Sequence, residues 1–300
     1  MITEVRTLPN TFSASISFKV RDYAQLVKLR LALLVVFSSV IGYLMAIQGE
    51  IEWGQLILLC LAGFFTTASS NVLNQVIEKD FDRLMKRTAN RPLPTDRMSV
   101  AEALLVAGIL GVAGISIFWI YFNQMSALLS ALALLIYAFI YTPLKRFSPV
   151  AVFVGALPGA LPPLIGFVAA VNHWAPVAFI LFGIQFVWQF PHFWAIAWVG
   201  WDDYLKAGYK LLPSKQGRNK FSAIQIVFYI IALIPMSLFP AYMGYSGIIS
   251  ALLVFACGII FLLQSIELLR SGTIESAKRL MFGSFFYLPV VLLALYFDRI

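Results

Sequence analysis

The sequence predicts an all-α membrane protein, a bundle of about nine spanning helices in a single domain covering residues 1–300. Of its 300 residues, 61% are hydrophobic and only 12% are charged, whereas soluble domains carry about 25% charged residues. The apolar residues also form long blocks without a charge, such as 31–47 and 127–141. A chain of this length cannot hide so much apolar surface from water by folding alone, so lipid must cover it.

Each apolar block has about the 20 residues that an α-helix needs to cross a bilayer. Backbone groups in lipid must bond within their own segment, which favours helices. Pro191 falls inside the sixth block and predicts a kink there, while the Gly and Pro residues of 155–166 predict a broken or closely packed helix. The expected spans are 27–48, 53–77, 100–122, 125–142, 149–171, 175–200, 220–241, 246–269 and 276–297.

The distribution of basic residues predicts the orientation of the chain. All 22 Lys and Arg residues except Arg299 lie before the first span, at its start, or in every second connection after it. The positive-inside rule places these connections, together with a polar N-terminal tail (1–24), in the cytoplasm. The first 20 residues resemble neither a signal peptide nor a transit peptide, which favours a bacterial inner membrane. The net charge of +8 suits anionic lipid headgroups, so the bilayer and no nucleic acid is the expected partner.

A candidate site lies where the second span leaves the membrane. Asn74, Glu78 and Asp82 are spaced four residues apart, which places three oxygen-bearing side chains on one helix face. Neighbouring carboxylates repel unless a cation neutralises them, and Mg²⁺ takes oxygen ligands while bridging to substrate phosphates. Arg87 and Arg91 follow, and their guanidinium groups suit phosphate oxygens. The pattern is typical of a metal–diphosphate site; a solvated helix end with ion pairs is the alternative interpretation.

A second acidic-then-basic group follows the sixth span. Asp202 and Asp203 precede Lys206 and Lys210 in the connection to the seventh span. Both polar groups are expected on the cytoplasmic side, so the second can face the first across a cavity and hold the metal from the opposite side. An ordinary charged loop has the same composition.

Polar residues inside a membrane helix are functional candidates. His192 lies in the sixth span beside Pro191, with Gln189 close by. Four roles are open to His192: contact with a porphyrin, ligation of iron, general base, or a hydrogen bond between helices. The tryptophans of the same span either line a hydrophobic substrate chamber or anchor the helix at the interface.

The segment from Asn74 to Pro94 resembles the first motif of the UbiA-type intramembrane prenyltransferases, and more closely that of the branch that attaches a farnesyl group to haem. Further stretches resemble this branch in the same order along residues 24–213: YTPLKR (141–146), GALPPLIG (159–166), WQFPHFW (188–194) and the segment 203–213. The chain departs from the wider family at Glu78 and Ala207, where that family usually has aspartates.

The resemblance implies transfer of the farnesyl group of farnesyl diphosphate to a vinyl group of haem B, giving haem O and diphosphate. It also implies a haem A synthase or a terminal oxidase assembly as a partner that receives the product. Mg²⁺ is the implied cofactor, with Asn74, Glu78, Asp82, Asp202 and Asp203 as ligands, and all of these except Asp202 counted as catalytic. The expected substrate-binding residues are Arg87, Arg91, Lys145, Lys206, Lys210, Tyr141, Gln189 and His192.

Two alternatives stay open on the sequence. A sister prenyltransferase would act on an aromatic acid, a quinone precursor or a chlorophyll-type ring, and the stretch 188–194 argues for haem instead. A transporter would place polar residues along its spans or show two similar halves. Here the charges stop at the predicted cytoplasmic edge, which counts against transport.

Overall fold

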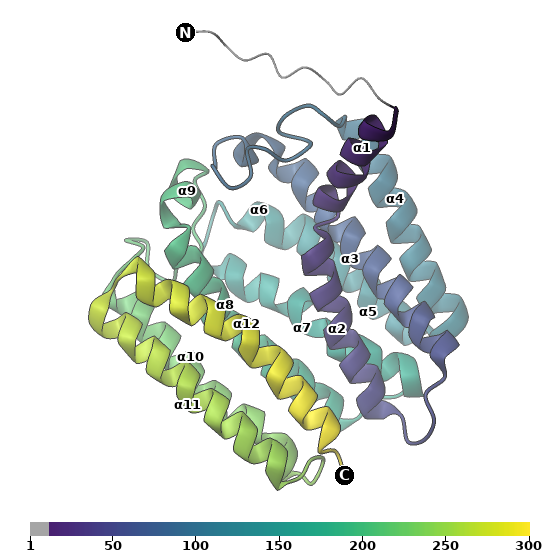
Figure 1. Cartoon of the computed structure of the whole chain (residues 1–300), viewed down its shortest axis with the longest axis vertical. Coiled ribbons are helices and arrows are strands. Elements are labelled where there is room, and N and C mark those ends of the chain that lie inside the picture. Colours follow the sequence, from purple (N-terminus) through teal and green to yellow (C-terminus); the bar gives the residue numbers. More distant parts are fainter. Residues whose placement is uncertain (1–11) are drawn as a thin grey trace.

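The computed structural model describes residues 12–300 and is helical throughout that range apart from turns and one isolated β-bridge (Figure 1). Nine helices of this part of the chain are long and apolar enough to cross a membrane. The predicted all-α membrane bundle is therefore confirmed. The spanning segments are α2 (Leu29–Ala46), α3 (Trp53–Asp82), α4 with η1 (Val100–Ile117, Phe118–Phe122), α5 with η2 and α6 (Gln124–Leu135, Ile136–Tyr141, Thr142–Leu144), α7 (Val150–Val171), α8 (Pro176–Val199), α10 (Lys220–Tyr242), α11 (Ile248–Ser271) and α12 (Ile274–Phe297).

The predicted polar N-terminal tail includes a helix, α1 (Phe12–Leu26). Residues 1–11 of that tail lie outside the described residues. Polar contacts hold α1 against the rest of the bundle: the Tyr23 hydroxyl donates to Glu102 at 2.6 Å, and Arg97 donates to Asp22 at 2.9 Å. A polar segment can thus fold on the bundle without an apolar stripe long enough to span.

One further detail differs from the sequence-based expectation, and another agrees with the expected span of 175–200. α3 continues to Asp82, five residues beyond the predicted end of that span, so the charged end of the motif belongs to the spanning helix. Pro191 does not end α8, which runs without a break from Pro176 to Val199. A proline removes only one backbone donor, and neighbouring helices compensate for that loss in a membrane protein.

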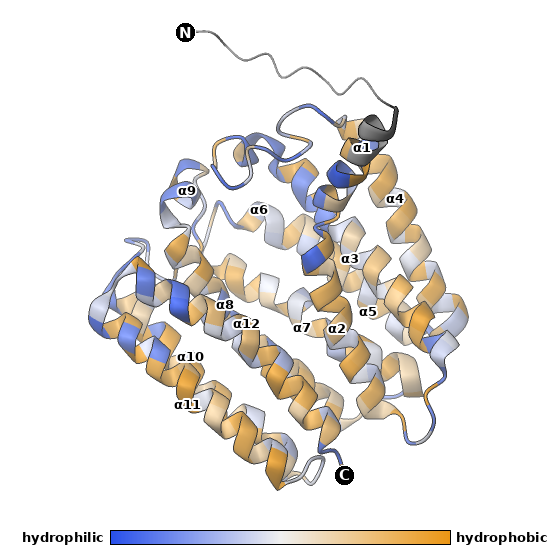
Figure 2. Cartoon of the chain, viewed as in Figure 1, coloured by the Kyte–Doolittle hydropathy of each residue, from blue (hydrophilic) through white to orange (hydrophobic). Residues whose placement is uncertain are grey.

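Hydrophobic residues run along the middle of the spanning helices, and hydrophilic residues gather at the end of the bundle near α9 (Trp201–Lys206) and the start of α2 (Figure 2). This end also holds the end of α3 and the short α6. The site therefore has to be sought where the polar end of the bundle meets its apolar interior.

α7 is the central helix of the bundle, with 72% of its spanning window buried. Its glycines allow neighbouring backbones to approach closely: a Cβ at Gly166 would collide with the Ser39 carbonyl, and a Cβ at Gly42 of α2 would collide with Pro163. Small residues serve this purpose at membrane helix interfaces, where packing drives association. The glycine- and proline-rich segment of α7 is therefore closely packed and unbroken.

Candidate active site

Three side chains of α3 form a buried polar row. Asn74, Glu78 and Asp82 share one helix face and are at most 5% exposed, as their spacing predicts. A row of buried oxygens is costly unless each finds a partner. The partners come from segments far away in the chain, which makes this row the point where several connections converge.

A cation faces each member of the row. The Lys28 ammonium donates to Asn74 Oδ1 at 2.7 Å, Lys145 donates to Glu78 Oε1 at 2.8 Å, and Arg91 donates to Asp82 Oδ2 at 2.6 Å. The second carboxylate oxygen of Asp82 is buried with no hydrogen-bond partner among the described residues. Three cations facing two carboxylates leave an excess of positive charge, which suits a polyanionic ligand.

Lys28 shows how strongly this charge is concentrated. It precedes α2 with a left-handed backbone, φ 51°, and this turn directs its side chain to Asn74 of α3. Burial, together with the positive charges of Arg91 and Lys145, lowers the pKa of Lys28 to about 7. An anion bound beside it would stabilise its charged form.

The arginine that faces Asp82 reaches it through a compact turn. After α3 ends, the Thr88 hydroxyl donates to the Asp82 carbonyl at 2.9 Å and closes the chain back on the helix end. The following residues continue through successive turns, so Arg91 returns to the carboxylate nine residues before it. The order of the motif, an acidic face followed by arginines, thus corresponds to a local fold in which Arg91 covers Asp82.

Lys145 approaches from the opposite side, on the segment that follows η2. Its ammonium lies 4.5 Å from the ring centroid of Tyr141 and 5.9 Å from that of Tyr209. The Lys210 amide donates to the Lys145 carbonyl at 2.7 Å, which fastens the connection after α9 to the one after α6. Burial and the nearby Glu78 carboxylate raise the pKa of Tyr209, so its phenol keeps its proton and remains a hydrogen-bond donor.

The second acidic group does not join this row. Asp202 is exposed and pairs with Arg218 at 3.2 Å, while Asp203 pairs with Lys206 at 3.1 Å. No cluster of three or more acidic, histidine or cysteine side chains suited to a metal occurs within residues 12–300. A metal held from both sides therefore receives no support from the geometry, and ligation by Asp202 or Asp203 stays a prediction.

Asp203 and Arg87 instead connect α9 to the turn after α3. The hydrogen bond from Lys206 lowers the pKa of Asp203, and backbone amides of Lys86 and Arg87 contribute to that shift. The Arg87 guanidinium donates to the Tyr204 hydroxyl at 3.2 Å. The exposed Lys206 and Lys210 also lie on this connection, so these two predicted residues and Arg87 lie outside the buried row, whereas Arg91 and Lys145 face it.

An apolar cavity lies below the polar row and encloses about 270 Å³. Asn71 and Ser70, about one turn before Asn74 on α3, contribute to its wall, as do Tyr137 and Tyr141. Both tyrosines belong to η2, a π-helical turn; such turns widen a helix and occur often at functional sites. The apolar cavity thus begins about one helix turn from the polar row, beside Tyr141, whose ring lies against the Lys145 ammonium; we call the cation-rich end of the cavity its mouth.

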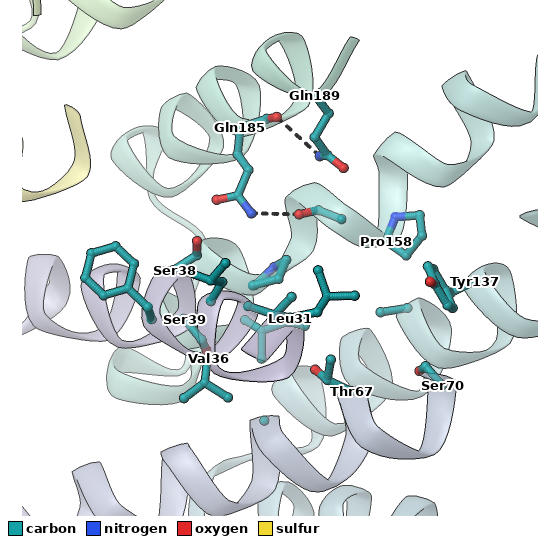
Figure 3. Close-up of a pocket in the computed structure, with 18 of the residues that line it drawn as sticks. Leu31, Val36, Ser38, Ser39, Thr67, Ser70, Tyr137, Pro158, Gln185 and Gln189 are labelled. Carbon is teal, nitrogen blue, oxygen red and sulfur yellow. Dashed lines mark hydrogen bonds between the residues drawn. The ribbon is translucent and has the colours of Figure 1, made fainter. Parts of the chain in front are cut away.

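The far wall of the cavity depends on a pairing between α7 and α8. Pro163 has no N–H to give to the Gly159 carbonyl four residues before it, and Gln185 of α8 supplies the missing donor at 2.7 Å. The Gln189 amide donates to the carbonyls of Ala156 and Gln185 at 3.1 and 3.2 Å. Figure 3 shows these two glutamines above the cavity, with α7 between them and the serines of α2.

His192 lines the same cavity and is 9% exposed. Its Nδ1 atom lies 2.8 Å from the Ser284 hydroxyl of α12. The imidazole stacks on Trp188 with ring centroids 4.4 Å apart and meets the edge of Phe285. Of the residues expected to bind substrate, the structure thus brings Tyr141, Gln189 and His192 to the cavity, and Arg91 and Lys145 to the polar row.

The sequence did not single out three residues that surround the polar row. Lys28 looks like one more basic residue before the first span, and its role depends on a turn that no pattern marks. Thr142 accepts a hydrogen bond from Asn74 at 3.0 Å, and Tyr209 is buried beside Lys145. Thr142 lies within the stretch 141–146 and Tyr209 within 203–213, so those two stretches were the only available signal.

The fold and site together define a polytopic membrane protein with a cation-rich polar site next to an apolar cavity. This arrangement is expected of an enzyme that handles a lipid-linked phosphate. The family model of the UbiA prenyltransferase family matches residues 35–288. The chain belongs to the UbiA family and is a membrane prenyltransferase.

Curated relatives carry a more specific name. The chain is 47% identical to a protoheme IX farnesyltransferase of Cytophaga hutchinsonii, over 93% of this chain and 97% of that protein. It is 41% identical to the enzyme of the same name from Flavobacterium johnsoniae, over 93% of this chain and 94% of the relative. The family resemblance drawn from the motifs is confirmed.

Solved structures share the fold. A structure from a study of digeranylgeranylglyceryl phosphate synthase superposes with a TM-score of 0.77 at 23% identity, covering 93% of this chain and 98% of the other. A UbiA homologue from Archaeoglobus fulgidus, solved with GPP and Mg²⁺, gives a TM-score of 0.71 at 17% identity, covering 91% and 99%. At these identities the likeness concerns the arrangement of helices.

Proposed function

We propose that the chain transfers the farnesyl group of farnesyl diphosphate to a vinyl group of haem B, giving haem O and diphosphate. The observation that carries the proposal is the polar row of Asn74, Glu78 and Asp82 with its three cations, directly above an apolar cavity. The names of the curated relatives support the choice of both substrates. The farnesyl chain suits the cavity, while the larger porphyrin reaches it with one edge.

The residues of the polar row fit a hard divalent cation. Asp82 offers a buried oxygen without a partner, and Asn74 and Glu78 offer oxygens on the same face. We propose Mg²⁺, which often binds through one or two carboxylates and completes its shell with substrate phosphates. When bound, Mg²⁺ would neutralise negative charge on the diphosphate. Asp202 and Asp203 are proposed to help from the rim.

The protein's own cations hold the leaving group. In the free chain Lys145 and Arg91 are paired with Glu78 and Asp82. A metal bound to these two carboxylates would leave both cations free to bind the diphosphate. Breaking the allylic C–O bond builds charge on the departing diphosphate, which fixed cations stabilise. Arg87, Lys206 and Lys210 are proposed to receive it at the rim.

The cavity protects the other half of the reaction. An allylic cation is quenched by free water, so it needs a dry chamber whose aromatic faces stabilise positive charge. Tyr137 and Tyr141 line the cavity next to Lys145 and are placed to serve this purpose. The vinyl group of the porphyrin then attacks the farnesyl carbon, and water adds a hydroxyl group at the neighbouring carbon and releases a proton, which gives haem O.

We further propose that the protein resides in the cell inner membrane with the polar row toward the cytoplasm, because the basic connections lie at that end. Its product would pass to a haem A synthase or to a terminal oxidase assembly. These assignments follow from the reaction and from the charge distribution.

Membranes containing the chain, incubated with labelled farnesyl diphosphate, haem B and Mg²⁺, test the proposed function. We expect labelled haem O, and no transfer by the Glu78→Gln variant at equal expression. If the label appears only on a quinone precursor, that precursor and not haem B is the acceptor. Normal transfer by Glu78→Gln would remove the polar row from the mechanism.

A further inference from the structure

Three polar side chains of α8, those of Gln185, Gln189 and His192, line the cavity and already donate hydrogen bonds to neighbouring groups. The side-chain amide nitrogens of Gln185 and Gln189 donate to backbone carbonyls (Figure 3), which fixes the amide orientation and leaves the amide oxygens as acceptors. Gln185 Oε1 is buried, and neither amide oxygen has a donor among the described residues. The Gln189 amide therefore offers only an acceptor, because both of its N–H groups are already used.

The hydrogen bonds of Ser284 favour one tautomer of His192. The Ser284 hydroxyl lies 2.6 Å from the Met281 carbonyl, which can only accept, and 2.8 Å from His192 Nδ1, so we assign the hydroxyl proton to the carbonyl and His192 Nδ1 as the donor to Ser284. The proton of the neutral imidazole consequently sits on Nδ1, and Nε2 carries the lone pair. No described residue forms a hydrogen bond with Nε2, while Trp188 and Phe285 hold the ring in place.

A free acceptor in an apolar cavity favours a ligand that brings its own O–H groups. Gln189 and His192 are three residues apart on α8, which places their side chains on adjacent turns of one face. A water molecule has two donors and suits two such acceptors, provided that polar partners surround it. A water held in this way is ordered and is not free to attack elsewhere.

We propose that Gln189 and His192 bind one water molecule, and that His192 Nε2 takes a proton from it as it adds to the prenylated porphyrin. This inference rests on the proposed function and names the residues that deliver the hydroxyl group of haem O. It assigns His192 as a general base.

The electrons and atoms balance as follows. The vinyl π pair forms the bond to the first carbon of the farnesyl group, while the allylic C–O pair leaves with the diphosphate. The carbon beside the pyrrole ring becomes a cation. A lone pair of the bound water forms the new C–O bond, and one water proton passes to Nε2. Water attached to a cationic carbon is strongly acidic, so a neutral imidazole suffices as the base.

The polar row on α3 and the water site on α8 serve two successive steps, release of the diphosphate and addition of water. The polar row on α3 lies at the mouth, whereas Gln189 and His192 lie on α8 along the apolar cavity. Water bound on α8 is held for the porphyrin carbon, which becomes cationic only after the allylic carbon has formed its bond to the vinyl group. Without that water, the porphyrin cation would lose a proton and become an alkene.

The test measures the mass of the haem product made by purified His192→Phe protein. We expect farnesylated haem lacking the elements of one water molecule, with the hydroxylated fraction reduced about a hundredfold. Gln189→Leu is expected to shift the product the same way. Gln264→Leu changes a glutamine of α11 that does not line the cavity, and we expect haem O from it.

Several outcomes would overturn the inference. Hydroxylated product from His192→Phe at the normal rate leaves the proposed function intact but removes the base, whereas no transfer by the unaltered chain refutes the proposed function itself. A histidine-ligated haem spectrum that His192→Phe abolishes would make Nε2 an iron ligand instead. If His192→Phe does not fold, Ser284→Ala, which frees the imidazole proton, decides: unchanged haem O and no alkene would contradict the proposal.

Discussion

Lys145 and Glu78 are 67 residues apart in the chain, yet their side chains meet at 2.8 Å inside the bundle. Counting side-chain atoms alone, only 10% of Lys145 and 7% of Glu78 are exposed. A buried pair of this kind is stabilising only while both partners are present, because each compensates for the lost hydration of the other. In this protein the same pair also stands ready to exchange partners with a metal and a diphosphate.

Removing one partner of this pair is expected to destabilise the protein. Lys145→Met should lower the free energy of unfolding by about 3–5 kcal/mol, because it leaves the Glu78 carboxylate buried and uncompensated. Thermal unfolding of the detergent-solubilised protein measures this loss. The double variant Glu78→Gln/Lys145→Met should regain much of the stability but no farnesyl transfer.

Arg279→Gln is the matched control for that cycle. Arg279 pairs with Glu267 at 2.6 Å, but both side chains are well exposed, and exposed pairs contribute only about 0–1 kcal/mol. Equal losses in Lys145→Met and Arg279→Gln would contradict the structural role given to burial.

Arg91→Lys tests the geometry of diphosphate binding without removing charge. Arg91 donates to Asp82 at 2.6 Å, and a lysine lacks the planar fork that holds two oxygens at once. We expect transfer to fall at least about tenfold, which corresponds to a loss of roughly 1.4 kcal/mol of transition-state stabilisation. Arg83→Lys, on an exposed pair with Asp96, should retain normal turnover; a similar loss in both variants would argue against a specific role.

Metal removal should stop the reaction without unfolding the chain. A chelator is expected to abolish transfer, and added Mg²⁺ to restore it, because without the metal Lys145 and Arg91 stay paired with Glu78 and Asp82 and are not free to offset the diphosphate charge. Because Lys145 and Arg91 neutralise Glu78 and Asp82 in the free chain, the melting temperature should hardly change. Turnover that persists after exhaustive chelation would remove the metal from the proposal.

Close packing of α2 on α7 gives a prediction about stability alone. Gly166→Ala would push a methyl group into the Ser39 carbonyl, and overpacking of this kind costs about 1–3 kcal/mol. Gly108→Ala in α4 meets open space and should be neutral or slightly stabilising, because alanine favours helices. Equal melting temperatures of the two variants would show that α2 and α7 can separate without cost.

The sequence predicted the spans well because each one satisfies its backbone internally and must be apolar for its whole length. It also predicted the shared face of Asn74, Glu78 and Asp82, since four-residue spacing is a local property of a helix. It could not predict that Lys28 reaches Asn74, or that Ser284 orients His192 from 92 residues away, because both contacts depend on how helices pack. The two aspartates after α8 pair with Arg218 and Lys206, and Asp203 also meets the backbone of Lys86 and Arg87 after α3; the sequence could not predict these partners, and metal ligation by the aspartates stays a prediction.

The proline-rich core helix also bears on how the protein enters the membrane. α7 contains three internal prolines, and Gln185 of α8 donates to its Gly159 carbonyl. Of the spanning helices within residues 12–300, α8 is the least apolar. Neither segment suits lipid on its own, since one lacks donors and the other carries surplus polar groups. The two should leave the translocon together as a hairpin, so a chain truncated between them would insert poorly.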